Sequence, residues 1–225
     1  MAHMCYIQYE VKRMRDFPLF TTQQGVASLT LSQIPFTKKA YIRIQSSLEP
    51  EAFLQECVSF CSACGAEEVF AAGHAICENY PLHTSILRMQ VPIEDIGDTD
   101  AALFPVTEQT LEEWRTIYNQ KVRNVPNGAW MTVKMANTLL KSGEGYFVHK
   151  NGDLLGIGQV SGAQIHWVAS LKPGAGADVV RALCHAVSVE TVYLEVASEN
   201  TKAVSLYKNL GFCVAQEISK WYRVK

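Results

Sequence analysis

The dipeptide Asn151-Gly152 is the feature that most constrains how this chain can fold. It separates two runs with strand-like patterns, residues 146–150 and 154–160. Asn-Gly suits the left-handed backbone of a two-residue type I′ turn, which joins neighbouring antiparallel strands. A third strand-like run, residues 164–169, follows shortly afterwards. We therefore predict a three-stranded antiparallel meander in this part of the chain.

The patterns on both sides of the meander predict the rest of the sheet. A short strand at 103–106 and two helices, at 108–122 and 131–140, precede it. A glycine-rich turn then leads into a helix at 177–187, a strand at 192–196, a helix at 200–210 and a last hairpin through Trp221 and Tyr222. This order predicts an α/β fold with a mixed, mostly antiparallel sheet and helices on both faces.

The first part of the chain has its own pattern of strands and one helix. Strand-like runs cover 25–31, 41–45, 68–72 and 85–91. Apolar residues recur at helical spacing over 51–64, between Pro50, a favoured first residue, and Gly65, a favoured terminator. Residues 1–91 are thus expected to form a smaller α+β lobe. The acidic segment 92–100 (PIEDIGDTD) is the expected linker, and residues 101–225 the main domain.

Composition excludes several classes of function. The 225 residues are 48% hydrophobic and carry a formal net charge of −2, without the basic surplus of a nucleic-acid-binding protein. No apolar run is long enough to span a membrane, and we see no signal-peptide pattern. The seven cysteines, an odd number, suit reduced thiols. We expect a cytoplasmic monomer or homodimer with no nucleic-acid or membrane partner.

The segment from Ser170 to Asp178 is the first candidate site. It joins a predicted strand to a predicted helix and contains Gly174 and Gly176. Glycines let a backbone approach a ligand closely, and a helix N-terminus offers unpaired N–H groups and partial positive charge. The segment could cradle a pyrophosphate, although Pro-Gly before a helix is also an ordinary turn.

The second candidate site is the segment 194–212. It combines Leu194-Glu195-Val196, Asn200, Ala203, Leu206-Tyr207 and Gly211-Phe212. This pattern resembles the signature of the GNAT N-acetyltransferases, and is especially similar to bacterial ribosomal-protein alanine acetyltransferases. Together with the order of elements, the resemblance covers a little over half of the chain. The N-terminal lobe could be an incomplete second copy of such a domain.

The resemblance implies acetyl-CoA as cosubstrate and a primary amine of a small molecule or peptide as acceptor. Glu195 matches the proposed general base, and Tyr207 matches the acid that protonates the departing thiolate. Pantetheine would pair with the fourth strand, and the pyrophosphate would rest on the loop that follows. The implied cofactor-binding residues are Trp167, Val168, Ala169, Ser170, Lys172, Gly174, Ala175, Gly176, Ala177, Asn200, Ala203 and Tyr207.

One position departs from the family pattern. Leu171 stands where the family loop has Gln or Arg, although both glycines are present. We expect backbone N–H groups to hold the phosphates, with Lys172 as a point charge.

Several candidate residues also have ordinary structural interpretations. Tyr207 could pack on the sheet, Glu195 could be solvated or pair with a base, and Asn200 could cap its helix. His166 lies on the fourth strand, where some relatives keep a base, but a lone strand histidine is more often structural. The chain could also keep the GNAT fold and only bind a ligand or partner.

Three cysteines raise a rival hypothesis. Cys57, Cys61 and Cys64 have the C-x3-C-x2-C spacing of the cluster-binding loop in radical SAM enzymes, which would imply iron–sulfur chemistry. They also extend the apolar face of the predicted helix, and cysteine is among the most buried residue types. We favour the interpretation as core residues and predict no metal site.

Overall fold

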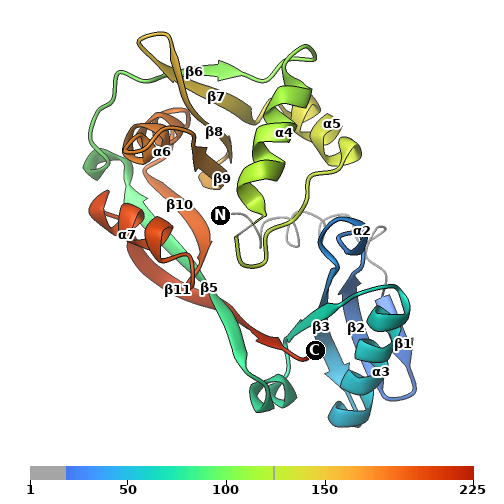
Figure 1. Cartoon of the computed structure of the whole chain (residues 1–225). Coiled ribbons are helices and arrows are strands. Elements are labelled where there is room, and N and C mark those ends of the chain that lie inside the picture. The colour runs from blue at the N-terminus through green and yellow to red at the C-terminus, as the bar shows by residue number, and fades with distance from the viewer. Residues whose placement is uncertain (1–18, 124) are drawn as a thin grey trace. The chain divides into compact units, whose positions relative to one another are not determined.

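The computed structural model describes residues 19–123 and 125–225, which adopt a mixed α/β fold (Figure 1). Eleven strands form one hydrogen-bonded sheet in the order β1-β2-β3-β4-β11-β5-β10-β9-β8-β7-β6. The strands are β1 (Leu19–Thr22), β2 (Gly25–Thr30), β3 (Lys39–Ser47), β4 (Glu68–Ala72), β5 (Leu82–Pro92), β6 (Ala102–Pro105), β7 (Gly145–Lys150), β8 (Asp153–Ser161), β9 (Gln164–Ser170), β10 (Thr191–Ala197) and β11 (Cys213–Arg223).

Six α-helices accompany these strands in the described residues. They are α2 (Ile34–Thr37), α3 (Pro50–Ala63), α4 (Leu111–Val122), α5 (Val133–Ser142), α6 (Gly176–His185) and α7 (Thr201–Asn209). Short 3₁₀ helices η1 (Ala75–Asn79) and η2 (Ile93–Asp95) flank β5. None of the described helices has both the length and the apolar character needed to cross a bilayer.

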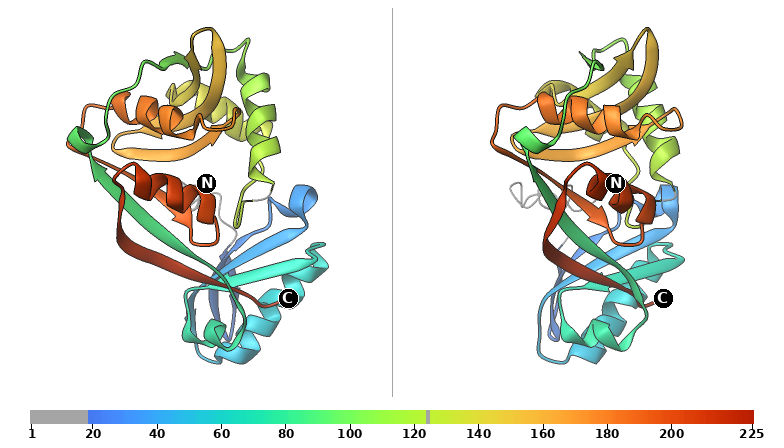
Figure 2. Two further views of the ribbon diagram at one scale, coloured as in Figure 1. Left: turned by 60° about the vertical axis from the view of Figure 1, so that its left-hand side comes forward. Right: turned by 90° about the vertical axis from the view of Figure 1, so that its left-hand side faces the viewer.

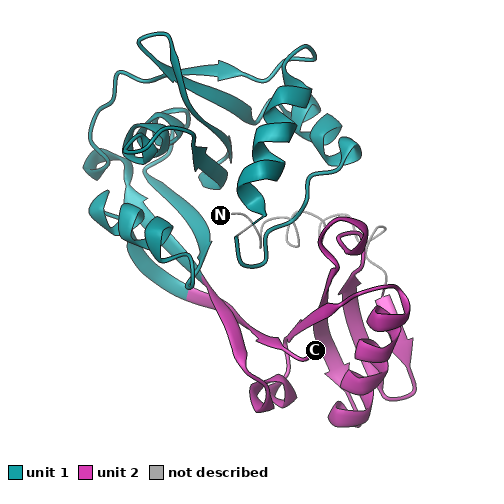
Figure 3. Ribbon diagram, in the orientation of Figure 1, with its two compact units in different colours: residues 1–5, 87–216 teal, residues 6–86, 217–225 magenta. Residues whose placement is uncertain are grey.

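The described chain divides into two compact units, residues 87–216 and residues 19–86 with 217–225 (Figure 3). A separate N-terminal lobe with a sheet of its own is not evident. Strands β1 to β4 belong to the same sheet as the rest, because β4 pairs with the end of β11, with Tyr222 opposite Ala71. The first 18 residues of the expected lobe lie outside the described residues.

Strand β11 corrects the expected hairpin at Trp221 and Tyr222. Residues 213–223 form one long strand that passes from one unit into the other (Figure 3). The segment has no Gly, Pro, Asn or Asp that would favour a tight turn. The short elements β1 and α2 were also absent from the sequence prediction.

The acidic segment 92–100 packs against α6. The carbonyl oxygen of Ile96 accepts a hydrogen bond from Arg181 Nε at 3.1 Å, and that of Gly97 lies 2.9 Å from His185 Nε2. The Ile96 side chain is buried in the core. The boundary between the two units lies earlier, between Ile86 and Leu87 within β5.

In the unit of residues 19–86 and 217–225, α3 packs on β2, β3 and β4. Phe53, Leu54, Cys57 and Cys61 form its buried face. The helix begins at Pro50 as predicted. It ends at the predicted Gly65, whose φ of 96° and backbone hydrogen bonds match a Schellman motif.

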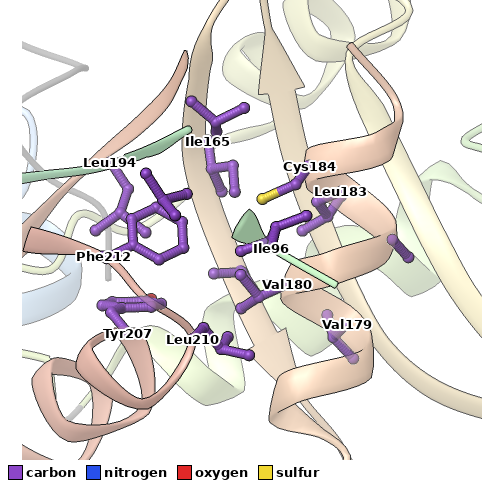
Figure 4. Close-up of a cluster of buried hydrophobic side chains, with 14 of the residues drawn as sticks. Ile96, Ile165, Val179, Val180, Leu183, Cys184, Leu194, Tyr207, Leu210 and Phe212 are labelled. Atoms are coloured by element: carbon purple, nitrogen blue, oxygen red, sulfur yellow. The ribbon is translucent and has the colours of Figure 1, made fainter. Parts of the chain in front are cut away.

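In the unit of residues 87–216, helices cover both faces of β7, β8 and β9 (Figures 1 and 2). Trp114 of α4 packs with Phe147 and Trp167 on one face. Val179 and Leu183 of α6 pack on the other face, in a core that also includes residues of α7 and β10 (Figure 4). The predicted turn is confirmed, since Asn151 and Gly152 have φ angles of 53° and 82° between β7 and β8.

Gly158 lets α6 approach the sheet closely. A Cβ atom at this position would lie 2.3 Å from Leu183 Cδ1 and 2.8 Å from Leu183 Cδ2. Leu183 is fully buried, so its side chain has little room to move.

We therefore expect Gly158→Ala to lower the free energy of unfolding by about 1–3 kcal/mol through overpacking. The double variant Gly158→Ala/Leu183→Val should lose less than the sum of the two single variants, because valine lacks the clashing atoms. Urea denaturation of the three variants measures this. Additive losses would contradict the close approach.

Candidate functional site

The central feature of the unit 87–216 is the divergence of β9 and β10. These parallel strands form two registered pairs, Gln164 with Tyr193 and Ile165 with Leu194. Strand β9 continues to pair with β8 as far as Ser170. Beyond Ile165, its edge towards β10 therefore has no registered strand partner among the described residues. An unpaired strand edge offers N–H and C=O groups to an extended ligand.

A β-bulge lies where the two strands separate. Val160 of β8 is opposite Ile165, and the next β8 residue, Gln159, is opposite Trp167. His166 is therefore an extra residue on β9. Bulges bend and twist a strand locally and are frequent beside active sites. The unpaired edge that follows comprises the predicted pantetheine-binding residues Trp167, Val168, Ala169 and Ser170.

The predicted phosphate loop joins β9 to the N-terminus of α6. Gly174 has a φ of 80°, and a Cβ atom on Gly176 would lie 2.9 Å from Leu206 Cδ2 of α7. Ala175 precedes the helix and has no side-chain group that could cap it. The first N–H groups of α6, at Gly176 and Ala177, have no acceptor within the helix. These donors suit an anion.

The cations near this loop have carboxylate partners. Lys172 Nζ lies 2.6 Å from Asp153 Oδ2, so it is not a free point charge. Lys150 contacts Asp100 at 2.5 Å and Asp178 at 3.3 Å. Asp178 lies in the first turn of α6, and its other oxygen accepts a hydrogen bond from Thr99. Asp178, the acidic residue of the first turn of α6, is therefore already bound by Lys150 and Thr99.

Helix α7 begins after Asn200. This residue is the N-cap, but its side chain makes no capping hydrogen bond. Asn200 therefore occupies the N-cap position without capping the helix, and its side-chain amide is not used by the helix. Ala203 and Tyr207 lie one turn apart on the buried face of α7.

Tyr207 is completely buried in the core between α6 and α7 (Figure 4). Its ring packs against Phe212 with centroids 5.6 Å apart. Its hydroxyl group has no hydrogen-bond partner among the described residues. Burial, with a smaller effect of Cys184, raises the pKa of Tyr207 well above its usual value. The phenol is therefore protonated at neutral pH.

Glu195 is a buried carboxylate on the opposite face of β10. Leu194 and Val196 point into the core with α6 and α7, so Glu195, which alternates with them along the strand, faces the other way. Its Oε1 lies 2.8 Å from Nη2 of Arg88 on β5. The Arg88 guanidinium also lies over the Tyr193 ring, 5.0 Å from its centroid.

The sequence interpretation missed Arg88. The residue is 107 positions from Glu195, and no local pattern connects the two. Its strand, β5, was predicted, but the neighbour of that strand in the sheet was not. A buried glutamate in a strand is nevertheless a signal that some cation lies nearby.

Four buried polar atoms around the divergence lack hydrogen-bond partners among the described residues. They belong to β9, β10 and α7, and are Gln164 Nε2, Trp167 Nε1, Glu195 Oε2 and Tyr207 Oη. An unpaired buried polar group costs about 1–3 kcal/mol, so each requires an explanation. Two of them, on Gln164 and Trp167, belong to β9, the strand that separates from β10.

Helix α4 and strand β9 form an aromatic cluster on the face of the sheet that Glu195 points to. Trp167 lies 4.4 Å from Tyr118 and 5.7 Å from Trp114 between ring centroids. The connection between α4 and α5 is held by Asn119, which forms two hydrogen bonds with the Met131 backbone, at 2.8 and 3.1 Å. Asn124 of this connection lies outside the described residues.

The cysteine hypothesis is not supported. Cys57 and Cys61 are buried on the core face of α3, and Cys64 is exposed at its end, so the three do not form a loop. Burial raises the pKa of Cys57 and that of Cys61 to about 12, which keeps both as thiols. The described residues contain no group of three or more His, Cys, Asp or Glu side chains that could hold a metal ion.

Comparisons with known proteins agree with this geometry at the level of the fold. An acetyltransferase of the GNAT family from Colwellia psychrerythraea superposes with a TM-score of 0.51 at 15% identity, over 92% of this chain and 84% of that chain. A functionally unknown conserved protein from Staphylococcus epidermidis gives 0.60 at 11% identity, over 92% and 93%.

A GCN5-related N-acetyltransferase from Anabaena variabilis gives a TM-score of 0.57 at 11% identity. The match covers 91% of this chain and 57% of that longer one. The fold is that of the GNAT acetyltransferases. No protein-family model matches the sequence, and no curated protein matches it either.

The unpartnered hydroxyl of Tyr207 leads to a stability prediction. Replacing a hydrogen-bonded buried hydroxyl usually costs about 1 kcal/mol, whereas removing an unpaired one does not. Tyr207→Phe should therefore leave the free energy of unfolding unchanged or raise it by up to about 1 kcal/mol. Urea denaturation without any ligand measures the difference. A loss above about 1 kcal/mol would mean that the hydroxyl has a partner in the free protein.

Proposed function

We propose that this chain is an acyl-CoA N-acyltransferase that transfers an acetyl group from acetyl-CoA to a primary amine. The observation that carries the proposal is the divergence of β9 and β10 beside the glycine loop of α6. It combines an unpaired strand edge, an anion-binding helix end and unpartnered polar atoms from both faces of the sheet.

The residues present fit such a cosubstrate. The edge of β9 from Trp167 to Ser170 can pair with the amide groups of a pantetheine arm. The amides of Gly176 and Ala177 can hold a pyrophosphate. Asn200 has a side-chain amide that its own helix does not use. Lys172, paired with Asp153, would contribute only through a change of partner.

The cosubstrate supplies an activated thioester, and the protein supplies proton transfer. We propose that Glu195 accepts a proton from the acceptor amine, directly or through water, with its unpartnered Oε2. Arg88 holds the other carboxylate oxygen. We propose that Tyr207 donates its phenolic proton to the thiolate that leaves. The two groups lie on opposite faces of the sheet, so a ligand that passes between β9 and β10 can meet both.

The acceptor is proposed to be a small molecule or peptide with a primary amine. The likeness of segment 194–212 to ribosomal-protein alanine acetyltransferases favours a peptide N-terminus as the first acceptor to test. We propose further that the protein acts in the cytoplasm, as a monomer or homodimer.

A non-catalytic ligand-binding protein with the same fold is the second candidate. Two observations favour it: Leu171 replaces the usual Gln or Arg of the loop, and Lys172 is already paired. Binding of CoA without turnover would identify this case.

The helix end can be tested with two matched variants. Ala177→Glu places a negative charge in the first turn of α6 and should raise the Kd for CoA at least about tenfold by repelling phosphate. Ala177→Gln has the same shape without the charge and should change the Kd little. Isothermal titration calorimetry measures both. Equal affinities for the two variants would place the phosphates elsewhere.

The proposed acid can be tested by thiol release from acetyl-CoA over a panel of primary amines and peptides. Tyr207→Phe should lower kcat about 10- to 100-fold with little change in CoA affinity, because the leaving thiolate loses its proton donor. Tyr146→Phe, on β7, is the matched control and should keep the wild-type rate. Full activity of Tyr207→Phe would rule out Tyr207 as the acid.

A further inference from the structure

We propose that Arg88 and Glu195 select an acceptor whose amine lies next to a carboxylate, namely a free α-amino acid. The proposal rests on the proposed function and narrows its acceptor from a primary amine in general to a zwitterion. Glu195 receives the ammonium group, and Arg88 binds the carboxylate of the same molecule. The two side chains belong to neighbouring strands, β10 and β5, within the unit 87–216.

The ion pair between Arg88 and Glu195 uses only part of what each group can offer. Arginine and a carboxylate frequently meet through two parallel hydrogen bonds. Here a single bond is formed, from Arg88 Nη2 to Glu195 Oε1 at 2.8 Å. Arg88 Nε and Glu195 Oε2 are both buried without a hydrogen-bond partner among the described residues. One donor and one acceptor therefore remain, on groups of opposite charge.

The ring of Tyr193 supports Arg88 without using its hydrogen-bond donors. Tyr193 and Glu195 lie on the same face of β10, because side chains alternate along a strand. The guanidinium carbon of Arg88 lies 5.0 Å from the centroid of the Tyr193 ring. An aromatic ring attracts a guanidinium through the face of the ring, whereas the N–H groups point outward in the guanidinium plane. Those N–H groups stay available for carboxylates.

The two charged groups differ in their access to solvent. The Arg88 side chain is 29% exposed, and that of Glu195 only 3%. An acceptor that arrives from solvent meets Arg88 first. The planar fork of a guanidinium matches the two oxygens of a carboxylate, so this exposed part of Arg88 can exchange water for such a group. Arg88 is thus placed to capture the acceptor, and Glu195 to receive its ammonium group.

The close spacing of the pair distinguishes a zwitterion from a simple amine. An ammonium ion at Glu195 is attracted by the carboxylate and repelled by the guanidinium beside it. Because Coulomb energy falls only with the first power of distance, the two effects partly cancel. An α-amino acid brings a negative charge for Arg88, one carbon atom away from its positive charge. The four charges then alternate, and each has neighbours of opposite sign.

A peptide N-terminus or an amino-acid amide has a neutral carbonyl group in place of the carboxylate. This group accepts a hydrogen bond from Arg88 but brings no charge. The repulsion between the guanidinium and the acceptor's ammonium group is then not offset. We therefore expect such acceptors to bind more weakly than the matching free amino acid.

The acetyl transfer balances and leaves the acceptor's carboxylate unchanged. The ammonium group loses a proton to Glu195 Oε2, and the free amine attacks the thioester carbonyl. A C–N bond forms and the C–S bond breaks, which gives an N-acetyl amino acid and CoA. Of the two protons that the nitrogen loses, one balances the proton that Tyr207 gives to the CoA sulfur, and the other enters solvent.

The test measures thiol release with matched pairs of acceptors. Each α-amino acid is compared with its own amide, for example glycine with glycinamide and L-alanine with L-alaninamide. For the best amino acid, the wild-type kcat/KM should exceed that of its amide at least about tenfold, mainly through a lower KM. The paired design cancels the contribution of the amino-acid side chain.

Variants of Arg88 test whether this residue causes the preference. Arg88→Met should raise the KM for the amino acid at least about tenfold, to that of the amide, and should lower kcat for both because Glu195 loses its partner. The ratio of the two KM values reports carboxylate binding, which a merely structural role would not change. Arg88→Lys keeps the charge beside Glu195 without the planar fork, so it should retain part of the preference. It also serves if Arg88→Met does not fold.

The matched control is Arg223→Met. This change removes an exposed arginine that pairs with Glu68 at 3.0 Å in the other unit. It should keep both the wild-type rate and the wild-type preference for the amino acid.

The outcomes distinguish this inference from the proposed function. Amides that are used as well as the free amino acids by the wild-type protein would overturn the inference alone. A preference that persists undiminished in the Arg88 variants would do the same. If the wild-type protein releases no thiol with any amine, the proposed function fails and the inference fails with it.

Discussion

The short ladder between β9 and β10 is the constraint on which the main unit depends. Two registered pairs hold the strands together at one end, and the extra residue His166 bends β9 away from its neighbour at that point. A β-sheet in a folded core normally pairs all its interior edges, because an unpaired backbone group in an apolar environment is costly. The open edge of β9 beyond Ile165 therefore costs free energy, and the helices packed on both faces of the sheet must offset this cost. Helices α4 and α5 on one face, and α6 and α7 on the other, form the two cores beside this opening.

The polar atoms around this opening are costly for the free protein. Tyr207 and Trp167 each bury a donor without a partner, and Glu195 uses only one of its two oxygens. Arg88 makes the burial of Glu195 possible, because a lone buried carboxylate would not remain charged. Stability alone would favour apolar residues at these positions.

Much of this arrangement follows from local sequence signals. The Asn151-Gly152 turn and the helix limits at Pro50 and Gly65 are confirmed, and strand alternation accounts for the direction of Glu195. These features depend on residues close together in the chain. The partner of Glu195 depends on strand order, which no local pattern encodes.

The misjudged segments show where local signals mislead. The segment 92–100 has the composition of a linker, but its backbone carbonyls bind α6. The sequence also contains no sign that Lys172 would pair with Asp153 across the loop. The single strand β11 was mistaken for a hairpin because both patterns alternate in the same way.

The path of β11 has a consequence for how the chain folds during synthesis. Strand β4 lies between β3 and β11, and the residues that complete its pairing, Tyr222 and Arg223, are translated some 150 positions later. Strands β1 to β4 therefore leave the ribosome well before β11, and β4 keeps one open edge until Tyr222 and Arg223 have been made. Their compact unit closes after translation of the segment that contains the candidate site. The exposed edge of β4 is then the place where a chaperone, or a neighbouring chain, would bind the growing polypeptide.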